Sequence, residues 1–158
     1  MTQIIIAVLI ILSVFGSVAM LKPSPRQQRL AKLRMDAIKL GLHVKLDTLK
    51  VNSKKTGVRD DIVAARYERF NTDVKSQALR WCVVRQAGWD QEGLPDGWSW
   101  HNMTKRPDLD KLNELLLKVS DDVVVVEAYD NRASIMTLEN KGSSAELINQ
   151  WVDDAQKL

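Results

Sequence analysis

Residues 107–138 read PDLDKLNELLLKVSDDVVVVEAYDNRASIMTL, and this stretch decides the fold class. Its first part, residues 107–119, repeats leucine at helical spacing and predicts an amphipathic helix. Residues 123–129 open with four consecutive valines and are largely β-branched, as expected of a strand with both faces buried. After a short turn at 130–132, residues 133–138 are predicted to pair back as a hairpin. A helix, a buried strand and a hairpin partner in this order favour an α+β fold.

The segments on either side extend this prediction. Residues 78–87 and 43–49 have the apolar pattern of strands, and residues 62–70 suit either a strand or a helix, with a strand favoured. Ser143 and Glu146 have the spacing of a capping box, which predicts the start of a last helix. The chain is therefore expected to contain at least two strands before the hairpin and one helix after it.

The order from residue 78 onward is strand, helix, strand, strand, helix. This order predicts a ferredoxin-like unit (β-α-β-β-α) that lacks its final strand. We expect residues 43–49 or 62–70 to add an edge strand beside 78–87. The resulting sandwich would have one antiparallel sheet with two helices on one face.

An uncharged apolar run covers residues 4–21, near the start of the chain. As a helix, its eighteen residues would be about 27 Å long, close to the hydrocarbon thickness of a bilayer. Residues 17–19 (Ser-Val-Ala) resemble a signal-peptide cleavage site, but residues 1–3 lack the basic charge that such peptides carry. We therefore expect a retained transmembrane anchor over residues 1–22.

Five basic residues follow the apolar run within thirteen positions: Lys22, Arg26, Arg29, Lys32 and Arg34. Because basic residues resist translocation, they predict an N-terminus outside a bacterial inner membrane and a cytoplasmic C-terminal domain. Residues 23–41 are expected to form a basic amphipathic helix next to the membrane, begun by Ser24 and ended by Gly41. Residues 42–158 would then form the cytoplasmic α+β domain.

Charge is unevenly divided along the chain. Residues 22–59 carry eleven Lys or Arg against two Asp, a net +9, whereas residues 60–158 carry a net −6. The five basic residues after the apolar run are candidates for binding anionic lipid, although they would also set topology without binding anything. Nucleic acid is not expected as a partner, because the acidic remainder offers no broad basic face.

Residues 88–102, GWDQEGLPDGWSWHN, hold three of the five tryptophans and show no regular period. Trp89, Trp98, Trp100 and His101 are candidates for contact with a protein partner, since indole rings anchor many interfaces. The same rings would serve equally well as a lid over an open part of the core, and a ligand pocket is a third alternative.

Catalytic and metal motifs are missing from the sequence. It contains two histidines and one cysteine, Cys82, with no metal-binding spacing, phosphate loop or nucleophile elbow. Cys82 lies in an apolar stretch and is expected to be a small core residue. We therefore expect neither a catalytic residue nor a metal or other cofactor.

Residues 20–29, MLKPSPRQQR, resemble the junction after the membrane span of YajC, the accessory subunit of the bacterial preprotein translocase. This resemblance implies one N-terminal span and a cytoplasmic C-terminal domain, and covers about thirty residues. The rest departs from that family, whose domain is shorter and mostly β and lacks the tryptophan segment and the two late helices. The chain also resembles small uncharacterised bacterial membrane-anchored proteins.

These features together predict a non-enzymatic, single-pass inner-membrane accessory or scaffold protein. Its partners would be membrane lipid and either a membrane protein or further copies of itself. The alternatives are a peripheral domain that binds anionic lipid and a translocase accessory subunit.

Overall fold

The computed structural model describes Ile6, Ile11 and residues 23–140 and 142–158. The chain divides into two compact units, residues 1–32 and 33–158. Apart from Ile6 and Ile11, the predicted anchor at residues 1–22 lies outside the described residues. Within the described part of the chain, no helix has both the length and the apolar character needed to cross a membrane.

Helix α2 (Pro25–Lys39) lies within the predicted range 23–41, with Ser24 and Gly41 just outside its two ends. The Gln27 amide donates to Ser24 Oγ at 3.2 Å, and the Ser24 amide donates to Gln27 Oε1 at 2.8 Å. This reciprocal cap satisfies two amides that the first turn leaves without helical partners. At the other end, Gly41 has a φ of +85°, the left-handed conformation expected at this position.

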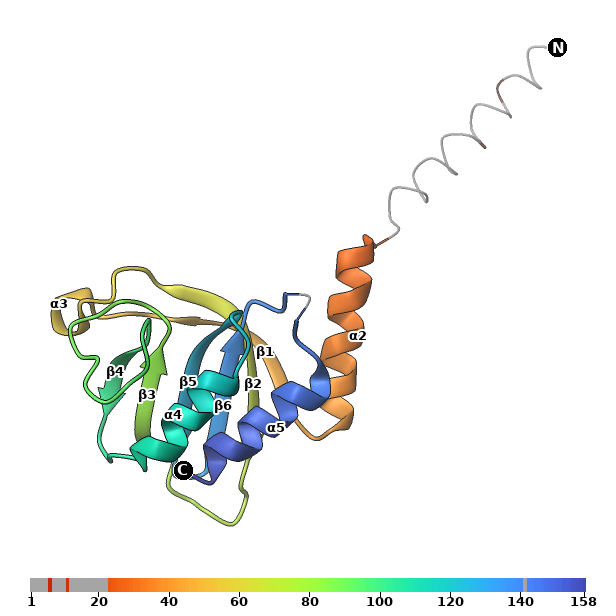
Figure 1. The fold of residues 1–158 in the computed structure, drawn as a ribbon. Coiled ribbons are helices and arrows are strands. Elements are labelled where there is room, and N and C mark those ends of the chain that lie inside the picture. The colour runs from red at the N-terminus through yellow and green to blue at the C-terminus, as the bar shows by residue number, and fades with distance from the viewer. Residues whose placement is uncertain (1–5, 7–10, 12–22, 141) are drawn as a thin grey trace. The chain divides into compact units, whose positions relative to one another are not determined.

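The second unit is built on one antiparallel sheet of six strands (Figure 1). The strand order across the sheet is β1-β2-β6-β5-β3-β4. In chain order the strands are β1 (His43–Leu49), β2 (Ile62–Phe70), β3 (Leu79–Val84), β4 (Ser99–Met103), β5 (Val123–Tyr129) and β6 (Arg132–Thr137). The α+β class is confirmed, and the bounds predicted for β1, β2 and β5 are matched.

The strand order differs from that of a ferredoxin-like unit. In that arrangement the strand after the crossover helix runs parallel to the strand before it, and the third strand lies between them. Here β5 pairs directly and antiparallel with β3, and β6 lies beyond β5. The predicted edge strand is also wrong, because β2 pairs with β6 and not with β3.

The cause of this difference is β4, a strand in the segment predicted to be irregular. β4 pairs antiparallel with β3 and carries the chain back before helix α4 (Leu109–Lys118) begins. With this added reversal, the chain leaves α4 running antiparallel to β3, so β5 pairs with β3 without a strand between them. β4 also occupies the edge beside β3 that β1 or β2 was expected to fill.

Helices α4 and α5 (Ala145–Gln156) cover one face of the sheet, called the helix face below (Figure 1). Leu33 and Ala37 of α2 belong to the same buried core, which explains why the second unit begins inside the predicted 23–41 helix. The central buried side chains of this core are Tyr67, Trp81, Val83, Leu112, Val126, Ile135, Ile148 and Val152.

The cap of α5 is displaced by one residue from its predicted position. Ser144 is the N-cap and accepts from the Leu147 amide at 3.3 Å. Ser143, predicted to cap, instead donates its hydroxyl to the buried carboxylate of Asp122. Either serine could cap the helix by its sequence position. Because the Ser143 hydroxyl donates to Asp122, Ser144 takes the capping position.

Residues 50–61, called the strap, join β1 to β2 and cover part of the opposite face of the sheet. The strap contains the short helix α3 (Ser53–Thr56), which lies near β3 and β4 in Figure 1. Val58 is fully buried in a second cluster with Cys82, Val84 and Met136. The strap is therefore part of the fold, and the side of the sheet that it crosses is called the strap face.

Candidate functional site

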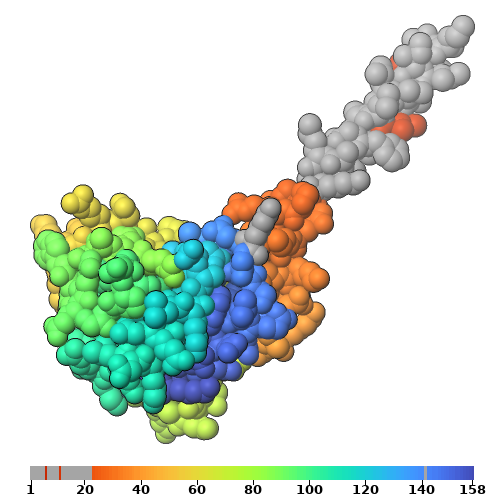
Figure 2. Space-filling view, viewed as in Figure 1, coloured from red at the N-terminus to blue at the C-terminus, as the bar shows by residue number. Residues whose placement is uncertain are grey.

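Two of the three candidate tryptophans are core residues. The side chains of Trp98 and Trp100 are 3% and 5% exposed and belong to the helix-face core. Trp100 Nε1 donates to the Glu92 carbonyl at 3.1 Å, and the Arg85 guanidinium lies 4.7 Å from the centroid of the Trp98 ring. In the space-filling view the green tryptophan segment forms part of the body of the domain (Figure 2). This placement is the one expected of a lid, and it leaves only Trp89 as an exposed indole from this segment.

Trp89 is 72% exposed and contacts the strap through both its backbone and its ring. Its amide donates to the Thr56 carbonyl in the strap at 2.8 Å. Its ring lies against Gly57, where an added Cβ would collide with the indole. Gly57 also has a φ of +73°, so only glycine fits this position without strain. An exposed indole that packs against a neighbouring segment suits an interaction hot spot, because tryptophan is enriched at such sites.

Two adjoining hollows lie beside Trp89 and share Gln86, and together they are called the Gln86 groove. The first encloses about 620 Å³ and the second about 380 Å³. The first is lined by Gly57, Arg59, Asp60, Gln86, Ala87, Gly88 and Trp89. The second is lined by Asp61, Ile62, Val63, Arg85, Gln86, Val124 and Leu138.

The groove combines exposed apolar side chains with charges of both signs. Val63 is 65% exposed in the second hollow and Leu138 is also exposed, while Trp89 lies in the first. Two arginines and two aspartates alternate with these groups, and Gln86 Nε2 donates to the Asp60 carbonyl at 3.1 Å. Apolar anchors among mixed polar groups suit a protein surface better than a small ligand, for which a deeper apolar pocket is usual.

His101 lies on β4, outside the residues that line the groove. Burial lowers the pKa of its imidazole, and the nearby Lys55 charge lowers it further. Its Nε2 atom is buried and has no hydrogen-bond partner within the described part of the chain. His101 is therefore not among the residues that line the groove, and contact of its side chain with a partner remains a prediction.

Arg34, predicted to bind lipid, is committed to a buried carboxylate. Its Nε donates to Glu139 Oε1 at 2.7 Å, and its Nη2 donates to Glu139 Oε2. The Tyr67 hydroxyl also donates to Glu139 Oε1, at 2.6 Å. The hydrogen bond to Glu139 raises the pKa of Arg34, whereas burial, followed by the same carboxylate, raises the pKa of Tyr67. Within the second unit, this bidentate pair joins Arg34 to the segment that follows β6.

The other basic candidates are located differently. Arg26, Arg29 and Lys32 belong to the first unit, and Lys22 lies outside the described residues. Lipid binding by these four side chains remains a prediction.

A charged cluster on the strap face escaped the sequence analysis. At its centre, the Arg66 guanidinium pairs with buried Glu127 and donates to Asp47 Oδ2 at 2.7 Å and Ser134 Oγ at 2.9 Å. Around it, Lys45 lies 3.1 Å from Glu68, and the Arg132 guanidinium lies 3.8 Å from the centroid of the Tyr129 ring. Charges at the alternate positions 66 and 68, in a strand whose first four residues are apolar, were the signal that could have revealed it.

This cluster has the character of a structural network. Each of its carboxylates, Asp47, Glu68 and Glu127, has a cationic partner. Cys82 lies beside it, but burial raises the pKa of its thiol to about 12, which the Arg66 charge only partly opposes. The thiol is protonated at neutral pH and is not a nucleophile.

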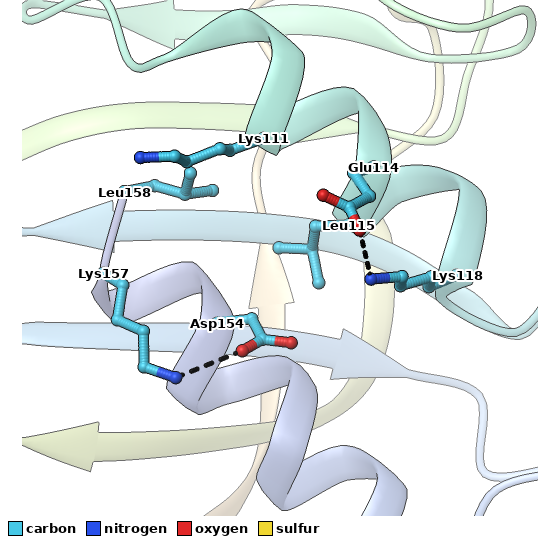
Figure 3. Close-up of a pocket in the computed structure, with 7 residues that line it drawn as sticks. All are labelled: Lys111, Glu114, Leu115, Lys118, Asp154, Lys157 and Leu158. Atoms are coloured by element: carbon cyan, nitrogen blue, oxygen red, sulfur yellow. Dashed lines mark hydrogen bonds and ion pairs between the residues drawn. The ribbon is translucent and has the colours of Figure 1, made fainter.

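A smaller hollow of about 180 Å³ lies between α4 and α5 (Figure 3). Each of its three lysines lies near a carboxylate, with Lys111 Nζ 3.4 Å from Asp108. Lys118 Nζ lies 2.6 Å from Glu114, and Lys157 Nζ lies 3.3 Å from Asp154. This hollow therefore offers no concentrated charge for a ligand.

Within the described part of the chain, no group of three or more His, Cys, Asp or Glu residues is placed to hold a metal ion. Comparisons with protein-family models, curated proteins and solved structures return no match to this chain. The best candidate site therefore rests on the geometry of the Gln86 groove.

Proposed function

We propose that this protein is a non-enzymatic, membrane-anchored binding protein that holds a protein partner along the Gln86 groove. The observation that carries this proposal is Trp89, which is 72% exposed and yet pressed against Gly57. An indole that already packs against a neighbouring segment loses less conformational entropy when a partner covers it than a fully free one. A large exposed apolar ring costs solubility, so a binding role gives a reason for its exposure.

The proposed mechanism is tethering. Residues 4–21 would anchor the chain in a bacterial inner membrane, and the basic residues that follow would keep the domain on the cytoplasmic side. Anchoring confines the groove to the membrane surface and raises its effective concentration toward a membrane-bound partner. An accessory subunit of a membrane complex fits this mechanism without requiring any reaction.

The test is to purify the tagged full-length chain from its native membrane in mild detergent and identify co-purifying proteins by mass spectrometry. Trp89→Ala should remove a stoichiometric partner, because it deletes the central apolar contact. Gly57→Ala should weaken the same interaction by displacing the ring. Leu117→Ala is the matched control, since Leu117 is 75% exposed on α4 and lies outside the groove.

Retention of the partner by Trp89→Ala, or equal loss with Leu117→Ala, would refute the groove as the binding surface. The anchor is tested separately by washing membranes at alkaline pH. Release of the intact chain into the supernatant would contradict a transmembrane anchor.

A further inference from the structure

The outer edge of β1 is open for pairing. β1 pairs only with β2, and no other strand among the described residues lies against its second edge. The Thr48 amide donates to the Asp47 carboxylate at 2.8 Å, which shows that it points away from β2. Because amide directions alternate along a strand, the amides of Val44 and Leu46 also point to this open edge. Leu46 is 69% exposed, so its side chain is also uncovered.

The sequence of β1, HVKLDTL, complements itself when it is reversed. In an antiparallel pair of two copies centred on Leu46, Lys45 of each copy lies opposite Asp47 of the other. Leu46 then lies opposite its own equivalent, and Val44 lies opposite Thr48. This register pairs all seven residues of the strand. Opposite charges directly across an antiparallel pair stabilise it, and like charges destabilise it.

We propose that two copies of this chain join edge to edge through β1, antiparallel and about a two-fold axis at Leu46. The two six-stranded sheets would become one continuous sheet. Such an interface is isologous, because the same strand contributes the same contacts from both sides. The dimer requires neither Trp89 nor the Gln86 groove, so it goes beyond the function proposed above.

The charged side chains have room to make these contacts. Lys45 lies 3.1 Å from Glu68 and 3.9 Å from Asp47 of its own chain, but its side chain is half exposed. Asp47 is bonded to Arg66 through Oδ2 while its Oδ1 accepts the Thr48 amide. In the dimer, the Thr48 amide would donate to Val44 of the second copy and leave Oδ1 to that copy's Lys45.

Charges on an edge strand commonly prevent pairing. Here the spacing has the opposite effect, because one residue separates Lys45 from Asp47. The antiparallel register about Leu46 converts that spacing into two attractive pairs across the interface. Pairing of one strand buries little area, so a high local concentration of the chain will favour the dimer.

Disulfide trapping of the full-length chain tests the register. Leu46→Cys should form a covalent dimer under mild oxidation, since facing residues bring Cα atoms within roughly 6 Å. Thr48→Cys is the matched control on the same strand and face. In the proposed register its two copies lie about 13 Å apart along the strands, beyond disulfide reach. The buried native Cys82 should give no dimer.

Charge reversal tests the same register independently. In the Leu46→Cys background, Lys45→Glu or Asp47→Lys should slow cross-linking by about tenfold, because both facing pairs become repulsive. Mixing the two variants should restore the yield as a heterodimer with opposite charges across both pairs. The proposal is overturned if Leu46→Cys gives no more dimer than Thr48→Cys, a comparison that does not depend on the charge variants folding. Failure of the mixture to recover, with both variants folded, would also overturn it.

Discussion

Replacing Arg66 by Met should strongly destabilise the domain, because it leaves the buried carboxylate of Glu127 without its cationic partner. The side chains of this pair are almost completely buried, and only Ser134 and Tyr129 would still donate to Glu127. Removing one partner of a buried ion pair costs about 3–5 kcal/mol. Domains of this size have a total stability of about 5–15 kcal/mol, so the loss is a large fraction of the whole.

The structure offers a direct assay for this loss. Four of the five tryptophans, Trp81, Trp98, Trp100 and Trp151, are buried, so unfolding will shift the fluorescence emission to longer wavelength. Urea titration of the full chain in mild detergent should show a midpoint lowered by about 2 M, given a typical dependence of 1–3 kcal/mol per molar urea.

A second variant separates the ion pair from the loss of packing. Arg66→Met/Glu127→Gln should be more stable than Arg66→Met alone, because a neutral amide keeps contact with Ser134 without leaving a buried charge. Asp47, the other partner of Arg66, is partly exposed and can be solvated by water. A loss below about 1 kcal/mol for Arg66→Met, or a double variant as unstable as the sum of the singles, would refute this reasoning.

Two further predictions concern buried acidic and thiol groups. Burial raises the pKa of Asp122, but the hydrogen bonds from Ser120, Ser143, the Asn140 amide and Thr137 together outweigh burial and hold the net pKa below its ordinary value. The stability that the ionised Asp122 carboxylate contributes is therefore complete above the unfolded pKa of about 3.9 and is lost as pH falls through the folded value. Asp122→Asn should consequently cost about 2 kcal/mol of folding stability at pH 7 and progressively less in acid. A cost that did not change with pH in urea titrations would contradict the charge-based account. Burial raises the pKa of the Cys82 thiol to about 12, so Cys82 should resist alkylation at pH 8 until urea unfolds the chain. Labelling is followed by mass spectrometry. Rapid labelling of the folded protein would show that the thiol is accessible.

Strong local patterns were sufficient to predict most of the elements. β1 alternates apolar and polar residues, and β5 opens with four consecutive valines, so the sequence alone located both strands at the observed bounds. The caps of α2 were equally visible, because Ser24 and Gly41 act through local backbone geometry. Elements of this kind are specified within a few residues of chain.

Strand order depended on an element with no local pattern. β4 is only five residues long, reads SWHNM, and follows a segment broken by Gly and Pro. It is a strand because β3 offers it an edge, which is a tertiary interaction between segments distant in sequence. Missing β4 meant missing one reversal of the chain, and that reversal changes the neighbours of β3 and β5.

The candidate site shows the same limit at the level of single residues. Trp89, Trp98 and Trp100 are chemically identical and lie within twelve positions, so their composition gave no means of separating them. The reversal at β4 turns Trp98 and Trp100 into the core, whereas the strap holds Trp89 at the surface through Gly57. A glycine at position 57 was the available signal, but its meaning depends on a ring thirty-two residues further along the chain.

The two proposed interaction surfaces meet at one point of the sheet. Val63 at one end of the Gln86 groove lies opposite Thr48 in the β1–β2 register, and Thr48 is a residue that the β1 dimer would pair with Val44 of the second copy. A second copy paired with β1 would therefore lie one strand away from Val63. If a partner bound in the groove also contacts that copy, then the partner must strengthen the dimer by the same factor by which the dimer strengthens partner binding, because binding free energies around a closed cycle are reciprocal. A tethered protein with these two adjacent surfaces would bind its partner best where its own copies are most concentrated.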